Sequence, residues 1–243
     1  DQVGDEGALR LSLMWRELEA KAQSTPNAVL GMLDILNSYS VRPATAREHL
    51  EPLVANAIDL ARRQQPAEAT WRFYVNLLGK FSDRLPSRKT IRELRMASDR
   101  LAADDPGSAR SALQDLNGQG RDVPAVLAAG IGDGLSRHSL CDSPSSQLAD
   151  IGKRDLLRLI AYSKRFSTSL ADGIRGCPIE WTRAAVDALE APDIDLVKRA
   201  RRNLLPVLNS PAHAPLFDPL LSDVTPGELP AIVRAVARAT NFG

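Results

Sequence analysis

The sequence predicts an all-α protein, built as a helical-repeat α-solenoid of the HEAT or armadillo kind and irregular in places. Apolar residues recur every three or four positions along most of the chain, with no sustained alternation of apolar and polar residues. A similar helix ending also occurs three times, as MLDILNSYSVRP from residue 32, YVNLLGKFSDRLP from residue 74 and ALQDLNGQGRDVP from residue 112. Amphipathic helices that end alike at regular intervals are typical of a repeat protein.

The interval between the endings agrees with this fold class. They start 42 and then 38 residues apart, close to the roughly 40 to 47 residues of HEAT and armadillo repeats. One amphipathic helix pair cannot bury its apolar face alone, whereas stacked pairs can. The segments LLRLIAYSKRF at 156–166 and RRNLLPVLNSP at 201–211 fit the ending more loosely. An ordinary helical bundle is the alternative.

Helix signals divide the first part of the chain. Pro26 is favourable at the first position of a helix with Thr25 as its N-cap. Pro52, inside an apolar pattern, predicts a kink or a late start, and the Asp104–Gly107 segment predicts a clear break. The expected helices of this part are one over 8–20, one that starts at Pro26 and is blocked by Pro43, one with apolar residues from 50 to 61, one over 66–85, and one capped by Ser87 with apolar residues from 91 to 101.

Further helices are expected in the second part of the chain. They span residues 108–117, 123–136, 146–151, 153–166, 179–190, 193–209, 214–222 and 227–240. The turn-rich segment RHSLCDSPSSQ predicts a loop near 137–147. We therefore expect N-terminal helical repeats over 1–136 and C-terminal repeats over 148–243, packed as one continuous domain.

The composition limits the classes of function. Of the 243 residues, 44% are hydrophobic and only 5% aromatic, so the core must consist mainly of aliphatic residues. The net charge of +1 argues against a protein that coats nucleic acid. Cys141 and Cys177 form no disulfide framework, which predicts a reducing, cytoplasmic compartment. No apolar stretch approaches the length of a membrane span, so no membrane partner is expected. Because the chain begins with Asp1, we expect it to be part of a longer protein.

Basic residues form three clusters at helical spacing. The first two make up the candidate binding surface: Arg88, Arg92 and Arg95, and Lys198, Arg199 and Arg202. The third contains Lys153, Arg154, Arg158, Lys164 and Arg165. If they aligned on one side, the clusters would attract phosphates or an acidic protein surface. The alternative is that they are ordinary solvated helix faces with acidic neighbours such as Asp99 and Asp195.

Other motifs could carry chemistry, but each has a simpler interpretation. His138 and Cys141 would suit an activated thiolate, although both lie in one expected loop. The glycines of GIGDG at 130–134 lack the strand that a dinucleotide-binding motif requires, and we expect them to allow close helix packing or to weaken one end of the helix. Trp181 is interpreted as a core residue. We therefore predict no cofactor, no metal and no enzymatic activity.

Two of the endings carry a resemblance to a known family. LGKFSDRLP contains Lys80 and Phe81, and AYSKRF contains Ser163 and Lys164. The chain resembles the SKWP-repeat effectors that plant-pathogenic bacteria inject through type III secretion, although no Ser-Lys-Trp-Pro tetrapeptide occurs in it. This resemblance implies two-helix repeats, interaction with a host protein and secretion into a host cell.

The expected function is that of a protein–protein interaction scaffold, because stacked helical repeats expose extended surfaces. The partner would be another protein. The alternative is a nucleic-acid-binding repeat domain that uses an Arg-rich face.

Overall fold

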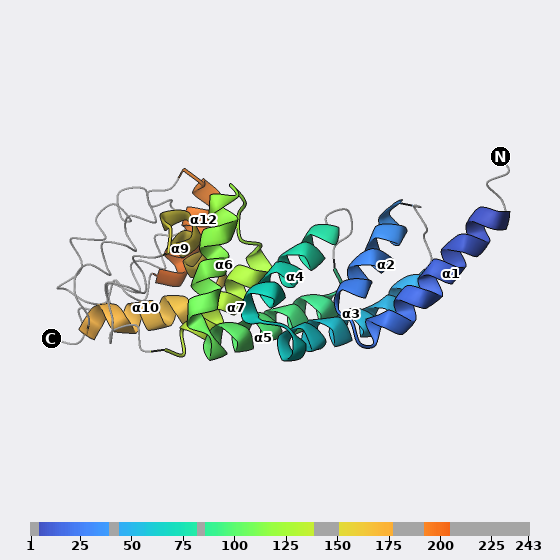
Figure 1. Cartoon of the computed structure of the whole chain (residues 1–243). Coiled ribbons are helices and arrows are strands. Elements are labelled where there is room, and N and C mark those ends of the chain that lie inside the picture. The colour runs from blue at the N-terminus through green and yellow to red at the C-terminus, as the bar shows by residue number, and fades with distance from the viewer. Residues whose placement is uncertain (1–4, 39–43, 82–85, 139–150, 177–191, 205–243) are drawn as a thin grey trace. The chain divides into compact units, whose positions relative to one another are not determined.

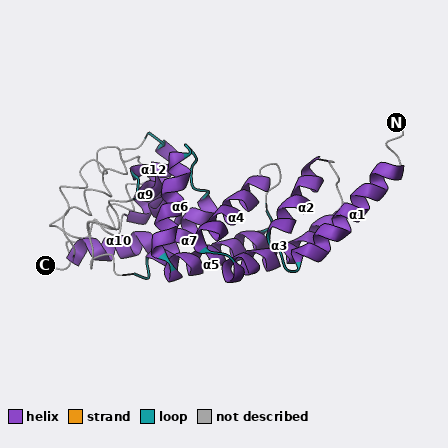
Figure 2. Cartoon of the chain, viewed as in Figure 1, coloured by secondary structure: helices purple, strands orange, loops and turns teal. Residues whose placement is uncertain are grey.

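The computed structural model describes residues 5–38, 44–81, 86–138, 151–176 and 192–204 (Figure 1). All regular elements within these ranges are α-helices, as Figure 2 shows, which confirms the predicted all-α class for this part of the chain. The helices are α1 (Asp5–Ala22), α2 (Asn27–Ser38), α3 (Ala44–Gln64), α4 (Ala67–Lys80), α5 (Arg88–Asp104), α6 (Pro106–Gly118), α7 (Ala125–Leu135), α9 (Lys153–Tyr162), α10 (Lys164–Gly176) and α12 (Ile194–Leu204).

The chain divides into two compact units, Asp1–Ser98 and Asp99–Gly243, with the boundary inside α5. In the first unit, α2 packs against α1, α3 and α4. In the second unit, α9 packs against α7, α10 and α12. The predicted loop near 137–147 lies mostly outside the described residues, so the predicted domain limits stay a prediction.

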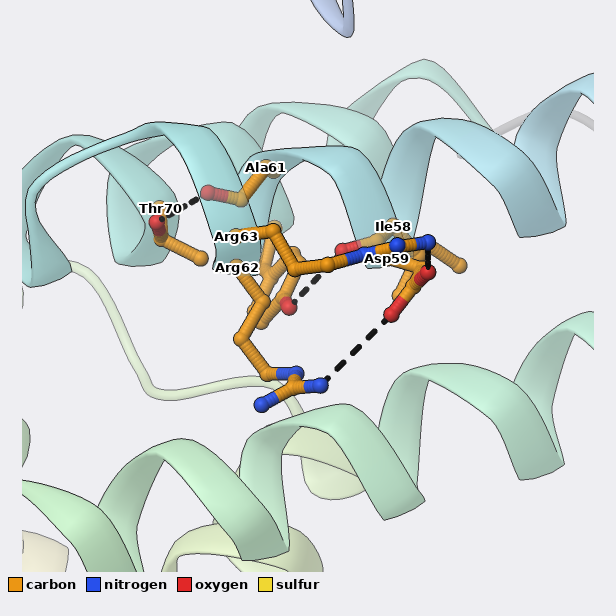
Figure 3. Close-up of polar contacts among 7 residues, drawn as sticks. Ile58, Asp59, Ala61, Arg62, Arg63 and Thr70 are labelled. Atoms are coloured by element: carbon orange, nitrogen blue, oxygen red, sulfur yellow. Dashed lines mark hydrogen bonds and ion pairs between the residues drawn. The ribbon is translucent and has the colours of Figure 1, made fainter.

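Two buried hydrogen bonds join α3 to α4 in the first unit, and Figure 3 shows the one from Thr70 to Ala61. The Thr70 hydroxyl donates to the carbonyl of Ala61 at 3.0 Å, and the Tyr74 hydroxyl donates to the carbonyl of Ile58 at 3.2 Å. Thr70 and Tyr74 are fully buried. Burial raises the pKa of Tyr74 far above its usual range, so its hydroxyl stays protonated and available as a donor.

The polar face of α3 carries ion pairs near these hydrogen bonds. Asp59 pairs with Arg63, four residues further along α3, and lies 3.6 Å from the guanidinium of Arg62 (Figure 3). Pairs at this spacing on an exposed helix contribute only a few tenths of a kcal/mol. The buried hydrogen bonds therefore stabilise this part of the first unit more than the ion pairs do.

The transitions on either side of α6 follow from the sequence. Asp105 separates α5 from α6, and its carboxylate accepts from the amide of Ser108 at 3.0 Å, as an N-cap does. The break predicted over 104–107 is thus a single residue. At the other end Gly120 has φ +66°, and the amide of Arg121 donates to the carbonyl of Leu116 at 2.8 Å. This left-handed C-terminal turn favours glycine.

The glycines of α7 lie where other helices approach closely. A Cβ atom at Gly132 would lie 2.5 Å from the Cβ of Ser163, and one at Gly134 would lie 2.4 Å from the carbonyl oxygen of Asp99. Both glycines are buried. The predicted role of GIGDG in close helix packing is confirmed.

Ser163 breaks the helix predicted over 153–166, so that prediction was wrong. Its backbone is extended, with φ −110° and ψ 108°, between α9 and α10. Its hydroxyl donates to Oδ1 of Asp133 at 2.7 Å and accepts from the amide of Phe166 at 2.9 Å. The apolar spacing continues through this point, but the contact with α7 and the new N-cap favour two helices.

Replacing Ser163 by alanine is expected to destabilise the protein by about 1–3 kcal/mol, because the change removes an N-cap and a buried donor to Asp133. Urea unfolding followed by far-UV circular dichroism would measure the loss. Thr168→Ala is the matched control, because Thr168 is exposed on the same α10 and donates only to the carbonyl of Lys164 in its own helix. Equal effects of the two substitutions would contradict this role of Ser163.

Several predicted boundaries differ from the observed ones. The late start at Pro52 was wrong, since α3 begins at Ala44 and continues through this exposed proline. Its cost of about 3 kcal/mol is offset by the buried side chains of Leu53, Val54 and Ala57. The helix predicted over 66–85 ends at Lys80. The helices predicted over 179–190, 214–222 and 227–240 lie outside the described residues, as do nearly all of 146–151 and the end of 193–209.

In the described part of the chain, no helix combines the length and the apolarity needed to cross a membrane.

Candidate protein-interaction surface

The first predicted cluster, Arg88, Arg92 and Arg95, lies on α5 in the first unit. All three side chains are exposed, and their spacing places them along one side of the helix. Leu94, Ala97 and Leu101 of the same helix are buried. These arginines therefore face away from the buried stripe of their own helix.

The second predicted cluster lies on α12 in the second unit. Arg199 and Arg202 are exposed and Lys198 is half-buried. Arg199 does not extend freely into solvent, because its Nε donates to the carbonyl of Ala161 at 3.0 Å. Asn203 donates to the carbonyl of Ile160 at 2.8 Å. Both bonds satisfy carbonyl groups in the last turn of α9, which have no partner within their own helix.

Part of the third basic cluster lies on α9, which packs against α12. Arg154, Arg158 and Tyr162 follow each other at four-residue intervals on α9, so they lie along one side of it. The guanidinium carbon of Arg158 lies 5.7 Å from the centre of the Tyr162 ring, and that of Arg199 lies 4.8 Å from it. Both distances are within the range of cation–π contact. Tyr162 thus connects the arginines of α9 to those of α12.

We call the residues along this path the basic row. It consists of Arg154, Arg158, Tyr162, Arg199 and Arg202.

An acidic residue fixes the first end of the basic row. Asp122, just before α7, lies 2.7 Å from Arg154 and 3.3 Å from Arg158. Nε of Arg158 also donates to the carbonyl of Val123 at 2.8 Å. The side chain of Arg158 is 14% exposed and that of Arg154 is 63% exposed. Both arginines are therefore held by Asp122, but Arg158 is largely covered whereas Arg154 is exposed to solvent.

A second carboxylate lies buried beneath this end of the row. Asp155, in the first turn of α9, is 3% exposed, and its Oδ2 has no hydrogen-bond partner. Burial and, after it, the neighbouring Asp122 raise the pKa of Asp155 to about 6, although Arg158 and Arg154 act in the opposite direction. Near neutral pH this group is charged without being fully compensated.

The charge of the chain is concentrated around the basic row. Helices α9, α10 and α12, which pack against one another, carry ten basic and three acidic residues, a formal charge of +7. The whole chain has a charge of +1, so all the rest of it carries −6. The low net charge is therefore a poor guide to this surface.

The candidate thiolate site receives no support. Arg137 pairs with Asp99 at 2.5 Å. Nε2 of His138 lies 2.8 Å from the carbonyl of Ala103; a carbonyl only accepts, so this nitrogen carries the proton and cannot act as a base there. Cys141 lies outside the described residues, as do Cys177 and Trp181. Among the described residues, no group of three or more His, Cys, Asp or Glu side chains could hold a metal ion.

Sequence reasoning found most of the basic residues but missed what arranges them. Tyr162, Asp122 and Asp155 were not recognised as parts of a site. The four-residue spacing of Arg154, Arg158 and Tyr162 is visible in the sequence and could have identified the α9 side of the row. The contacts with Asp122 and Arg199 come from segments more than thirty residues away.

Comparisons of the chain with protein-family models, with curated proteins and with solved structures found no match.

Proposed function

We propose that the chain is a protein–protein interaction scaffold made of HEAT- or armadillo-like helical repeats. One observation carries the functional part of the proposal: three packed helices hold a formal charge of +7 and an exposed isoleucine, Ile194, and six of their basic side chains are exposed among those that the structure describes. A surface that combines strong charge with an exposed apolar group is typical of a site for another molecule.

The repeat arrangement is supported by the intervals between helices that pack together. Helices α2 and α4 start 40 residues apart, and α9 and α12 start 41 residues apart. Hydrogen bonds link the ends of both pairs, since Asn37 donates to the carbonyl of Lys80 and Asn203 to that of Ala161. Lys80 also pairs with Asp34. Two helix pairs in different parts of the chain thus have nearly the same spacing between their first residues. In both pairs an asparagine side chain donates to a backbone carbonyl of the other helix, as expected for repeats.

The resemblance to SKWP-repeat effectors and secretion into a host cell stay predictions within this proposal. Ser163 and Lys164, which carry part of the resemblance, lie at the junction of α9 and α10. Nucleic-acid binding through arginines is the alternative function, and the charge of +7 gives it a physical basis.

Affinity capture from plant and bacterial lysates, with and without nuclease, tests the scaffold proposal. We expect a defined protein to remain bound after nuclease treatment, and the variant Lys198→Gln/Arg202→Gln to lose it. The proposal assigns binding to α9, α10 and α12 and leaves out the predicted cluster on α5. The matched control, Arg88→Gln/Arg92→Gln, removes two exposed charges from α5 and should therefore retain the protein. Material that disappears with nuclease would contradict the scaffold and favour nucleic acid.

A further inference from the structure

We infer that the basic row and the adjoining outer side of α12 bind an acidic amphipathic segment of a protein, in which carboxylates alternate with apolar side chains. The inference rests on the proposed function and names the chemistry of the partner. Three observations support it. Arg158 and Arg199 of the basic row are already held in place, an exposed apolar residue lies on α12, and the Tyr162 ring is already contacted by two guanidinium groups.

The charges of the basic row are arranged before any partner arrives. Arg158 is fixed by Asp122 and by the carbonyl of Val123, and Arg199 by the carbonyl of Ala161 and the Tyr162 ring. A side chain that is already ordered loses less conformational entropy on binding. Arg202 is exposed beside these fixed groups, and a guanidinium can bind a carboxylate through two parallel hydrogen bonds. Arg154 is also exposed, although Asp122 already pairs with it.

The outer side of α12 adds an apolar contact to these charges. Ile194 is 68% exposed. Ile194, Lys198 and Arg202 follow each other at four-residue intervals, so they lie along one side of the helix. An apolar side chain of a partner could cover Ile194 while its carboxylates meet Lys198 and Arg202. Such a partner is amphipathic and acidic.

A phosphate chain fits this surface less well. Asp122, Asp193 and Asp195 are exposed on or beside the same helices and would repel a phosphate chain, whose charges are continuous. The proposed segment alternates carboxylates with apolar side chains, so its apolar positions can face these aspartates. The half-buried Tyr162 ring, the aromatic candidate for base stacking on α9, is already contacted by two guanidinium groups. Nucleic-acid sites that read single strands usually offer free aromatic faces. Exposed Ile194 also has no role against phosphate.

Fluorescence anisotropy with the full 243-residue chain tests the inference. The probe is a fluorescein-labelled helical peptide with Glu on one side and Leu on the other. The comparison ligands are the same peptide with Gln in place of every Glu, and a short DNA duplex. We expect the Glu peptide to bind about tenfold more tightly than the Gln peptide, and this advantage to shrink as salt is raised.

Two variants locate the binding site. Lys198→Gln/Arg202→Gln should weaken binding of the Glu peptide about tenfold, and Ile194→Ser should weaken binding of both peptides. The α5 control, Arg88→Gln/Arg92→Gln, should leave both affinities unchanged. Circular dichroism checks that each variant is folded, and we expect it to be so because Ile194, Arg202, Arg88 and Arg92 are exposed and Lys198 is only half-buried.

Three results would overturn the inference: equal binding of the Glu and Gln peptides, an equal loss in the α5 control, or displacement of the Glu peptide by the DNA duplex at lower concentration. Failure here is distinguishable from failure of the scaffold proposal. If a protein survives nuclease in the capture experiment but the Glu peptide does not bind, only the chemistry of the partner is wrong. If nuclease removes all captured material, the scaffold itself is wrong.

Discussion

Replacing Gly134 by alanine is expected to destabilise the second unit by about 3 kcal/mol, because the added methyl group has no room. Its Cβ would lie 2.4 Å from the carbonyl oxygen of Asp99, 2.7 Å from the Cβ of Ala102 and 2.8 Å from the amide nitrogen of Ala103. Two of these are backbone atoms of α5, so no side-chain rotation can relieve the clash. The gain in helix propensity of about 1 kcal/mol is too small to compensate.

Urea unfolding of the variant and the parent chain would measure this effect as a shift in midpoint. Gly118→Ala is the control in the same unit, because a Cβ there meets nothing within 4 Å. We expect this substitution at the end of α6 to be neutral or to stabilise by a few tenths of a kcal/mol. A Gly134→Ala protein as stable as the parent would mean that α5 and α7 do not approach as closely as described.

Replacing Asp155 by asparagine is expected to stabilise the protein at neutral pH by roughly 1–3 kcal/mol. The carboxylate is buried, its Oδ2 has no hydrogen-bond partner, and Asp122 lies nearby. An amide of nearly the same shape removes the buried charge and with it the repulsion between the two carboxylates. Equilibrium unfolding of both proteins at pH 7.5 would measure the gain.

Asp155 makes the free energy of unfolding fall as the pH rises, whereas a salt-bridged carboxylate makes it rise. The pKa of Asp155 is about 6 in the folded chain and 3.8 without the fold, so the folded state binds the proton more tightly. The destabilising contribution is therefore fully present above pH 6 and disappears as the pH falls toward 4. The advantage of Asp155→Asn should shrink over that interval, and an advantage independent of pH would contradict the assignment.

The sequence was sufficient to predict which residues lie on the buried side of a helix and which lie on the exposed side. Buried Trp71, Leu94 and Leu101 and exposed Arg88 and Arg92 follow directly from a period near 3.6 residues. Helix identity over the described ranges follows from the same signal, because each position depends only on its near neighbours.

The features that were missed depend on contacts between distant segments. Ser163 ends a helix whose apolar pattern continues, because Asp133 and Gly132, about thirty residues earlier, meet it. Pro52 does not delay α3, because burial of its neighbours offsets the local cost.

The same reason explains why the candidate site was found only in part. Arginines at helical spacing are visible in the sequence. Asp122 meets Arg158, and Arg199 meets Tyr162, only after α9 has packed against α7 and α12. The overall charge of +1 misled for a related reason. The net charge does not show where the charged residues lie, and their positions decide what a surface attracts.

The concentration of positive charge on α9, α10 and α12 also sets the distance at which the protein attracts a charged molecule. From far away only the monopole of +1 acts, and it is too weak to draw a partner in. The charge of +7 on the three helices becomes effective only within about 8 Å at physiological salt. Electrostatic attraction would then hardly raise the rate at which a partner first meets the protein. It would mainly slow the dissociation of a partner that already touches these three helices.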